Sequence, residues 1–184
     1  MQPPGKSVCV YCGSRSGAKP AYFDAAAQTG RMLARNGWRL VYGAGDVGLM
    51  GAVAEAAQAE GGASLGVIPV HLIPHEAQRA LPRSHVVTET MHERKKVMFM
   101  NADAVVVLPG GAGSLDEFFE VLTWRQIGLH DKPLFLLDAA GYWQPLLALI
   151  DHVVAEGFAD GSLKGFVTAR PDVASLERAL RAVL

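Results

Sequence analysis

Short apolar runs alternate with segments of helical periodicity along the whole of this 184-residue chain. We predict strands at Ser7–Tyr11, Arg39–Tyr42, Ser64–Ile68, His85–Val87, Ala104–Leu108, Pro133–Leu137 and Gly165–Ala169. Helical spacing indicates helices from Pro20 to about Asn36, Gly48 to about Glu60, Met91 to about Asn101, Leu115 to about Ile127, Tyr142 to Ala155, and from near Val173. Such alternation predicts an α/β protein, with a parallel sheet covered by helices on both faces. The length suits one domain spanning residues 1–184.

Composition excludes several classes of protein. The net charge is only -1, which argues against a nucleic acid partner, because such a partner requires a basic face. No apolar run approaches the roughly 18 residues that a membrane span needs. The first residues lack the apolar core of a signal peptide, so we expect a cytoplasmic protein with no membrane association.

Cys9 and Cys12 are the only two cysteines, and their spacing is that of a C-x-x-C motif. A zinc site requires a second pair of ligands, and a redox motif of the thioredoxin type begins a helix. Here the pair belongs to a predicted strand, in which positions three apart face opposite sides. We therefore expect ordinary buried thiols and no metal site.

The segment Pro109–Glu117 carries the strongest functional signal. Its glycines follow the predicted strand Ala104–Leu108 and lead into a helix, and glycines at such a turn let a ligand approach the backbone. The first N–H groups of a helix favour an anion such as phosphate, and Glu117 lies close by. The same letters have a second interpretation that needs no ligand. Ser114-x-x-Glu117 is also the pattern of a capping box.

Two other glycine turns follow strands and are expected at the same edge of the sheet, namely Gly13–Ser14 and Gly43-x-Gly45-x-x-Gly48. The second has the spacing of a dinucleotide fingerprint, but the next strand ends without the acidic residue that binds a ribose hydroxyl. This argues against NAD and leaves a turn near a mononucleotide, or simple close packing. Gly13, Ser14 and Gly43 are therefore candidate ligand-site residues.

Arg94 shares a predicted helix face with Met91 and Met98. Because an unpaired buried charge is costly, Arg94 needs a partner. That partner is either a structural carboxylate, a bound phosphate or Glu117. Lys95 is placed to reach solvent or the same ligand, and Thr90-x-x-Glu93 reads as the capping box of this helix.

The segment Pro109–Glu117 and the sequence Met-His-Glu-Arg-Lys at 91–95 together resemble the LONELY GUY family, the cytokinin riboside 5′-monophosphate phosphoribohydrolases, whose members are often labelled lysine decarboxylases. The resemblance covers about residues 7 to 160. It extends to 8–14, 40–43, 48–51, 66–69, 123–128, 130–133 and 157–158. Ser114 stands where the family usually has Thr, which keeps the hydroxyl.

The resemblance implies a Rossmann-like, doubly wound fold and hydrolysis of the N-glycosidic bond of a purine nucleoside 5′-monophosphate, with no cofactor. It places the catalytic pair at Arg94 and Glu117, the phosphate loop at Gly110, Gly111, Gly113 and Ser114, and further nucleotide contacts at Glu76, Lys95 and Thr123. It also implies a homodimer. The residues themselves favour a dimer too, because one side of a sheet needs less apolar surface than is supplied together by Met91, Met98, Phe99, Phe118, Phe119, Leu122 and Trp124.

Two alternatives stand beside this interpretation. A nucleotide- or cofactor-binding carrier on the same fold needs the glycine loop but not Glu117 together with Arg94. Lysine decarboxylation uses a cofactor held as a lysine Schiff base, and of the six lysines only Lys95 and Lys96 lie near the predicted site. The sequence does not distinguish AMP from N6-prenylated AMP. A prenyl tail is expected to meet the long segment Pro69–Ser84, in which we predict no regular element.

Overall fold

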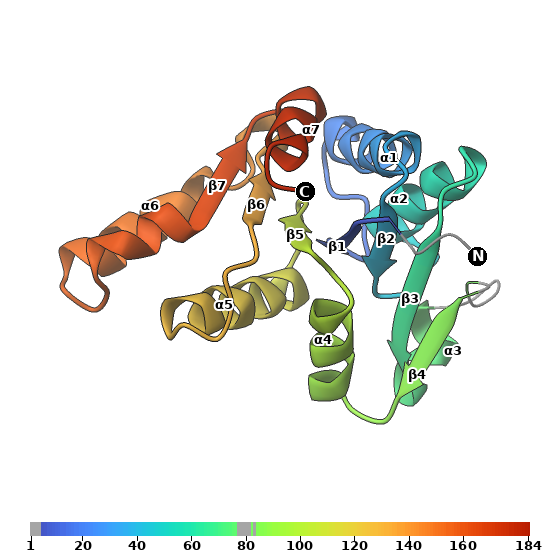
Figure 1. The fold of residues 1–184 in the computed structure, drawn as a ribbon, viewed down its shortest axis with the longest axis horizontal. Helices are drawn as coiled ribbons and strands as arrows, with labels where there is room; N and C mark the ends of the chain where they lie inside the picture. The colour runs from blue at the N-terminus through green and yellow to red at the C-terminus, as the bar shows by residue number, and fades with distance from the viewer. Residues whose placement is uncertain (1–4, 77–81, 83) are drawn as a thin grey trace.

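The computed structural model describes residues 5–76, 82 and 84–184. Within these residues, seven strands form one parallel sheet in the order β4-β3-β2-β1-β5-β6-β7 (Figure 1). The strands are β1 Ser7–Tyr11, β2 Arg39–Tyr42, β3 Ser64–Pro69, β4 His85–Thr88, β5 Ala104–Val107, β6 Leu134–Leu137 and β7 Val167–Arg170. The predicted α/β fold with an all-parallel sheet is confirmed.

The helices are α1 Pro20–Arg35, α2 Gly48–Ala59, α3 Ile73–Glu76, α4 Met91–Met100, α5 Ala112–Gln126, α6 Gln144–Ala155 and α7 Val173–Arg181. Three short 3-10 segments join them, η1 Val70–Leu72, η2 Ala139–Gly141 and η3 Gly161–Phe166. Two predictions need correction. The segment from Pro69 begins with η1 and α3, and α5 starts three residues earlier than Leu115. No described helix has both the length and the apolar composition that crossing a bilayer requires.

Alternate residues of the central strands enter two separate cores. Val8 and Val10 of β1 pack on one face with α1, α2 and α7, whereas Cys9 and Tyr11 pack on the other with α4, α5 and α6. Helices therefore cover both faces, as predicted (Figure 1). Cys12 joins the core opposite to Cys9, and both thiols are buried, which agrees with the expectation from a strand of period two.

The core corrects the argument made for a homodimer. Of the seven apolar residues attributed to a dimer surface, four are buried within the chain's own core: Met98, Phe99, Phe118 and Leu122. Their helices α4 and α5 pack on the sheet and bury more of their surface than their sequence periodicity indicates. Burial of each such side chain contributes roughly 1.5–3 kcal/mol to folding, so they are accounted for without a partner.

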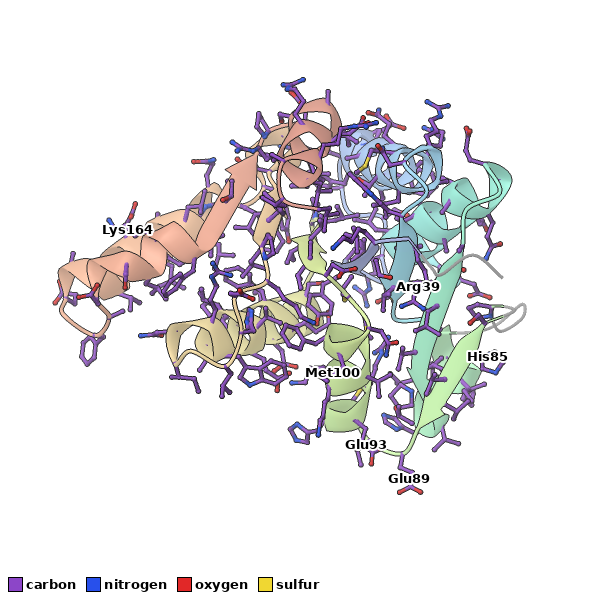
Figure 2. All side chains as sticks on the ribbon, viewed as in Figure 1. Arg39, His85, Glu89, Glu93, Met100 and Lys164 are labelled. Atoms are coloured by element: carbon purple, nitrogen blue, oxygen red, sulfur yellow. The ribbon has the colours of Figure 1, made fainter. Side chains whose placement is uncertain are left out.

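A capping box fixes the start of α4. The Thr90 hydroxyl accepts a hydrogen bond from the Glu93 N–H at 3.2 Å, and the Glu93 carboxylate accepts from the N–H groups of Thr90 and Glu89 at 3.2 and 2.9 Å (Figure 2). This prediction is confirmed. Because the helix begins at Met91, Arg94 and Lys95 both lie within its first two turns.

The order in which strands are added to the sheet changes direction between β4 and β5. The first four strands are laid outward from β1 to β4, and the chain then returns through α4 to place β5 on the other side of β1, where Val8 pairs with Ala104. In open parallel sheets a ligand crevice lies at such a switch point, beyond the carboxyl ends of the strands. The loops that follow β1 and β5 meet at this point.

Candidate active site

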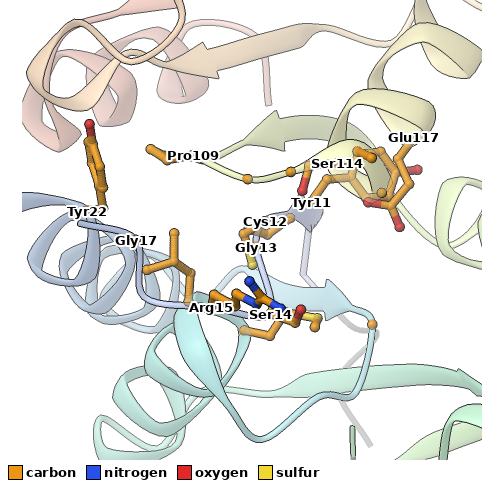
Figure 3. A pocket seen from close by; sticks show the side chains of 18 of the residues that line it. Tyr11, Cys12, Gly13, Ser14, Arg15, Gly17, Tyr22, Pro109, Ser114 and Glu117 are labelled. Atoms are coloured by element: carbon orange, nitrogen blue, oxygen red, sulfur yellow. The ribbon is translucent and has the colours of Figure 1, made fainter. Parts of the chain in front are cut away.

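A cavity of about 620 Å³ opens at the switch point, between the loops that follow β1, β2 and β5 (Figure 3). Nine of the predicted site residues line it: Gly13, Ser14, Gly43, Arg94, Gly110, Gly111, Gly113, Ser114 and Glu117. The structure thus brings together the three glycine turns and the proposed catalytic pair. Leu72 of η1 also lines the cavity, so the segment that follows β3 reaches the site.

The helix that starts in this cavity does not have the capping box that was the second interpretation of Ser114 and Glu117. α5 begins at Ala112, and its N-cap residue is Gly111, which has no side chain to cap the helix. Ser114 therefore lies inside the first turn, and Glu117 lies almost a full turn further along. The N–H groups of this first turn have no acceptor within the helix, and in P-loops a bound anion accepts hydrogen bonds from such groups. The ligand interpretation of the segment is favoured over the structural one.

Two glycine turns approach each other backbone to backbone. A Cβ atom on Gly110 would lie 2.1 Å from the Ser114 hydroxyl and 2.9 Å from the Gly13 nitrogen. The Gly13 N–H donates to the Pro109 carbonyl at 3.0 Å, which ties the loop after β1 to the loop after β5. Only glycine at position 110 leaves room for this junction.

Tyr142 contacts the loop that follows β5 through a hydrogen bond. Its hydroxyl donates to the Gly110 carbonyl oxygen at 2.6 Å. Because the peptide bond is planar and trans, the Gly111 N–H points away from that carbonyl. Tyr142 was missed from the sequence, where it only marked the start of a helix, since nothing local shows that it reaches a loop 32 residues earlier.

Arg94 is held by main-chain oxygens. The side chain is buried, with 5% of its surface exposed, and its Nε and Nη2 atoms donate to the carbonyls of Val67 and Gly43 at 3.1 and 2.8 Å. A Cβ atom on Gly43 would lie 2.1 Å from Nη2, so the turn after β2 is shaped to the guanidinium. The partners anticipated from the sequence did not include main-chain carbonyls. These carbonyls orient the group without cancelling its positive charge.

Glu117 lines the cavity half-buried on α5. Its negative charge affects the pKa of Cys9 in β1. Burial raises the pKa of the Cys9 thiol, the Glu117 carboxylate raises it further, and Arg94 on the same cavity wall acts in the opposite direction. Glu117 and Arg94 therefore have opposite effects on the pKa of this thiol.

Three predicted nucleotide contacts stay predictions. Lys95 and Thr123 are not among the described residues that line the cavity: Lys95 is buried against α5, and Thr123 is exposed on it. Glu76 is the last residue of α3, and its side chain lies outside what the structure describes.

Sequence reasoning also missed Arg15 and Tyr22 on the cavity wall (Figure 3). The signal for Arg15 was present, because it directly follows the Gly13–Ser14 turn. Tyr22 contacts Tyr142 edge to face with ring centroids 5.3 Å apart, a pairing of α1 with the segment after β6 that depends on the tertiary fold. In the described part of the chain, no group of three or more His, Cys, Asp or Glu side chains is placed to hold a metal ion.

Residues 50–180 match a protein-family model described as "Possible lysine decarboxylase". The cavity offers little to that description. None of the six lysines, all of which lie in the described part of the chain, is among its lining residues.

Solved structures with a similar fold include the molybdenum cofactor carrier protein of Chlamydomonas reinhardtii. It has a TM-score of 0.74 and 22% sequence identity, and the match covers 97% of each chain. A second structure, that of the molybdenum cofactor binding protein of Rippkaea orientalis, has a TM-score of 0.71 and 20% identity over 97% of this chain and 98% of the other. At this identity the likeness concerns the fold alone.

Curated relatives are much more similar in sequence. The cytokinin riboside 5'-monophosphate phosphoribohydrolase of Rhodococcoides fascians is 44% identical over 182 residues, covering 98% of this chain and 91% of that protein. LOG7 of Arabidopsis thaliana, of the same described activity, is 44% identical over 175 residues, covering 95% and 81%. With this identity over nearly its whole length, the chain belongs to the family of cytokinin riboside 5'-monophosphate phosphoribohydrolases.

Proposed function

We propose that the cavity binds a purine nucleoside 5′-monophosphate and hydrolyses its N-glycosidic bond, giving the free base and ribose 5-phosphate. The observation that carries this proposal is the position of Arg94 and Glu117 on the wall of the same cavity as the uncapped start of α5. A phosphate cradle alone suits a carrier, whereas a buried cation and a carboxylate beside it suit bond cleavage.

The 5′-phosphate is assigned to the loop of Gly110, Gly111, Gly113 and Ser114. Main-chain N–H groups at the start of α5 donate to its oxygens, and the helix dipole favours its charge. Gly13 and Ser14 line the cavity on the side of β1. The Gly43 carbonyl accepts a hydrogen bond from Arg94 and so holds the guanidinium at the cavity wall. Anchoring the phosphate fixes the distance from the loop to the anomeric carbon, which raises the rate by positioning.

Glu117 is assigned the chemical step. Cleavage of an N-glycosidic bond develops positive charge on the ribose, as in other glycoside hydrolysis. An ionised Glu117 stabilises that charge and accepts a proton from the attacking water, whose oxygen bonds to the anomeric carbon as the bond to the base breaks. The departing base takes up a proton at its nitrogen from solvent, and Glu117 releases the proton that it accepted, so that one water is consumed in each turnover. Arg94 holds the phosphate or Glu117 in register.

The test is base release from AMP and from adenosine, measured side by side. Because two charge-assisted hydrogen bonds to phosphate are together worth about 3–4 kcal/mol, we expect kcat/KM for AMP to exceed that for adenosine by roughly 100- to 1,000-fold. Equal rates on the two substrates would remove the phosphate anchor. Absence of free adenine with AMP and with N6-isopentenyl-AMP would favour the carrier alternative.

The choice of base rests on the apolar part of the cavity. Met50, Leu72, Met91 and Met98 line it together with Arg94. Flexible methionines adapt to apolar groups of varied shape, so we propose that both AMP and N6-prenylated AMP are substrates. Comparing kcat/KM on AMP and N6-isopentenyl-AMP measures the preference. The measurement on AMP also tests whether the protein is an AMP nucleosidase.

We also propose a homodimer, with a surface that keeps Phe119 from the sequence prediction and adds three exposed residues. Large apolar side chains are exposed on α4, α5 and the segment after α5: Met100 (Figure 2), Phe119, Ile127 and Leu129. The packing of Phe99 against Trp124 and His130 brings these segments together. Exposed apolar groups of this kind are typical of an interface, and twofold dimers are the commonest assemblies.

Sedimentation at micromolar concentration should give a species of twice 19.6 kDa, about 39 kDa. Replacing Ile127 and Leu129 together by Asp should shift the mass toward 19.6 kDa, whereas Leu149→Asp on α6, also exposed, should not. A wild-type protein that sediments as a monomer contradicts the proposal.

A further inference from the structure

Lys95 bridges the two helices that carry the proposed catalytic pair. It follows Arg94 on α4, and its ammonium lies 3.0 Å from the Asp116 carboxylate and 3.3 Å from that of Glu120. Asp116 directly precedes Glu117 on α5, and Glu120 lies one turn beyond Asp116. The two carboxylates therefore lie on one face of α5, and Glu117, next to Asp116 in the sequence, lies about 100° around the helix from it.

This bridge differs from an ordinary surface ion pair because its cation is buried. Lys95 has only 5% of its surface exposed. Burial by itself lowers the pKa of the ammonium, but hydrogen bonds to Asp116 and Glu120 outweigh that effect, so the pKa is raised and Lys95 is charged at neutral pH. An isolated buried ammonium is strongly unfavourable, and the bridge is therefore a firm contact.

The two basic residues tie α4 to different parts of the molecule. Arg94 contacts the turn after β2 and the main chain of β3 through the Gly43 and Val67 carbonyls. Lys95, one residue and about 100° further around the helix, contacts α5. α4 is thus fixed to one half of the sheet by Arg94 and to the helix carrying Glu117 by Lys95.

We infer that Lys95 is a positioning residue, whose bridge to Asp116 and Glu120 sets the place of Glu117 relative to Arg94. The inference rests on the proposed function, since it concerns the geometry of that reaction. It replaces a direct contact of Lys95 with the nucleotide, the role that the family resemblance suggested. The two roles predict different kinetics. A contact to the nucleotide affects binding, whereas a positioning bridge affects turnover.

The experiment compares Lys95→Met, Lys95→Arg, Glu120→Gln and the double variant Lys95→Met with Glu120→Gln. For each we measure kcat and KM on AMP, the affinity for ribose 5-phosphate by calorimetry, and the melting temperature. We expect Lys95→Met to lower kcat by roughly 10- to 100-fold, because small displacements of a reacting group have effects of this size. The affinity for ribose 5-phosphate should change by less than about twofold, because the loop at Gly110–Ser114 is untouched.

The double variant provides the decisive comparison. If Lys95 acts through the carboxylates, removing Glu120 as well costs no further activity, so the two effects are not additive. Lys95→Arg, which keeps the charge and reaches the same carboxylates, should recover part of kcat. Loss of ribose 5-phosphate affinity on Lys95→Met, with an independent and additive effect of Glu120→Gln, would overturn the inference in favour of a nucleotide contact.

Asp116→Asn keeps the inference testable if Lys95→Met does not fold. The Asp116 side chain is 59% exposed, and in this variant the buried Lys95 keeps its ion pair with Glu120 at 3.3 Å. It should lower kcat severalfold at unchanged ribose 5-phosphate affinity. Unchanged kcat in both Asp116→Asn and Glu120→Gln rejects the inference.

Lys164→Met serves as the matched control, because its ion pair with Asp151 is exposed and far from α4 (Figure 2), and it should behave as wild type. If the wild-type protein releases no base, the proposed function is rejected. That result is distinct from a rejection of the role of Lys95, which is measured on the variants.

Discussion

Glu117→Gln is expected to reduce base release from AMP by roughly 1,000-fold or more, the size of effect seen when a charge that stabilises a transition state is removed. The amide keeps the shape of the side chain but carries no negative charge and accepts no proton from water. Because α5 begins at Ala112, Glu117 is not part of a helix cap, and the melting temperature should stay within a few degrees of wild type.

Three measurements on this variant, base release, AMP affinity and melting temperature, decide between chemistry and structure. AMP affinity should remain, since the phosphate loop is intact. Glu156→Gln, an exposed exchange of the same kind at the end of α6, is the control and should behave as wild type in all three. Near-normal base release by Glu117→Gln would remove the main physical reason to regard the cavity as catalytic.

Gly43→Ala is expected to lower kcat/KM by roughly 10- to 100-fold. The added Cβ would lie 2.1 Å from Nη2 of Arg94, so the guanidinium must leave its place and lose the 2.8 Å hydrogen bond to the Gly43 carbonyl. A buried hydrogen bond to a charged group is worth about 1.5–3 kcal/mol, which sets the expected range. Because the displaced atoms are the end of a flexible side chain, activity should suffer more than stability.

The same measurement in an Arg94→Met background tests the cause. If the effect of Gly43→Ala operates through Arg94, it should nearly vanish once the guanidinium is absent. Gly165→Ala, where an added Cβ meets no atom within 4 Å, controls for the exchange of glycine for alanine. A full effect of Gly43→Ala without Arg94 would show that the turn itself, and not the arginine, is responsible.

The strands and the site loops were predictable because their signals are local. Apolar runs indicated all seven strands. Glycine turns follow three of them, and the rule for open parallel sheets brought Gly13, Gly43 and Gly110 to one edge. The start of α5 was not predictable in this way. Glycines at 110, 111 and 113 are poor helix formers, and the helix begins among them because packing against Gly13 and Tyr142 holds the loop.

The partners of charged residues were the other gap. A sequence shows that Arg94 and Lys95 are adjacent, but the partners of Arg94 are carbonyls 27 and 51 residues away, and those of Lys95 lie on another helix. Main-chain acceptors have no sequence signature, since every residue supplies one. Long-range pairings of this kind decide whether a basic residue near a site faces a ligand or the protein.

The pairing of β1 with β5 has a consequence for synthesis of the chain. The loop of Gly13 and Ser14 is made early, but the loop of Gly110–Ser114 that completes the cavity is made nearly a hundred residues later, after the return through α4. A ribosome-bound chain that ends before β5 lacks the loop of Gly110–Ser114, to which we assign the 5′-phosphate. Under that assignment we expect nucleotide to bind only after β5 has paired with β1, and so to stabilise the junction of the two loops rather than any earlier step of folding.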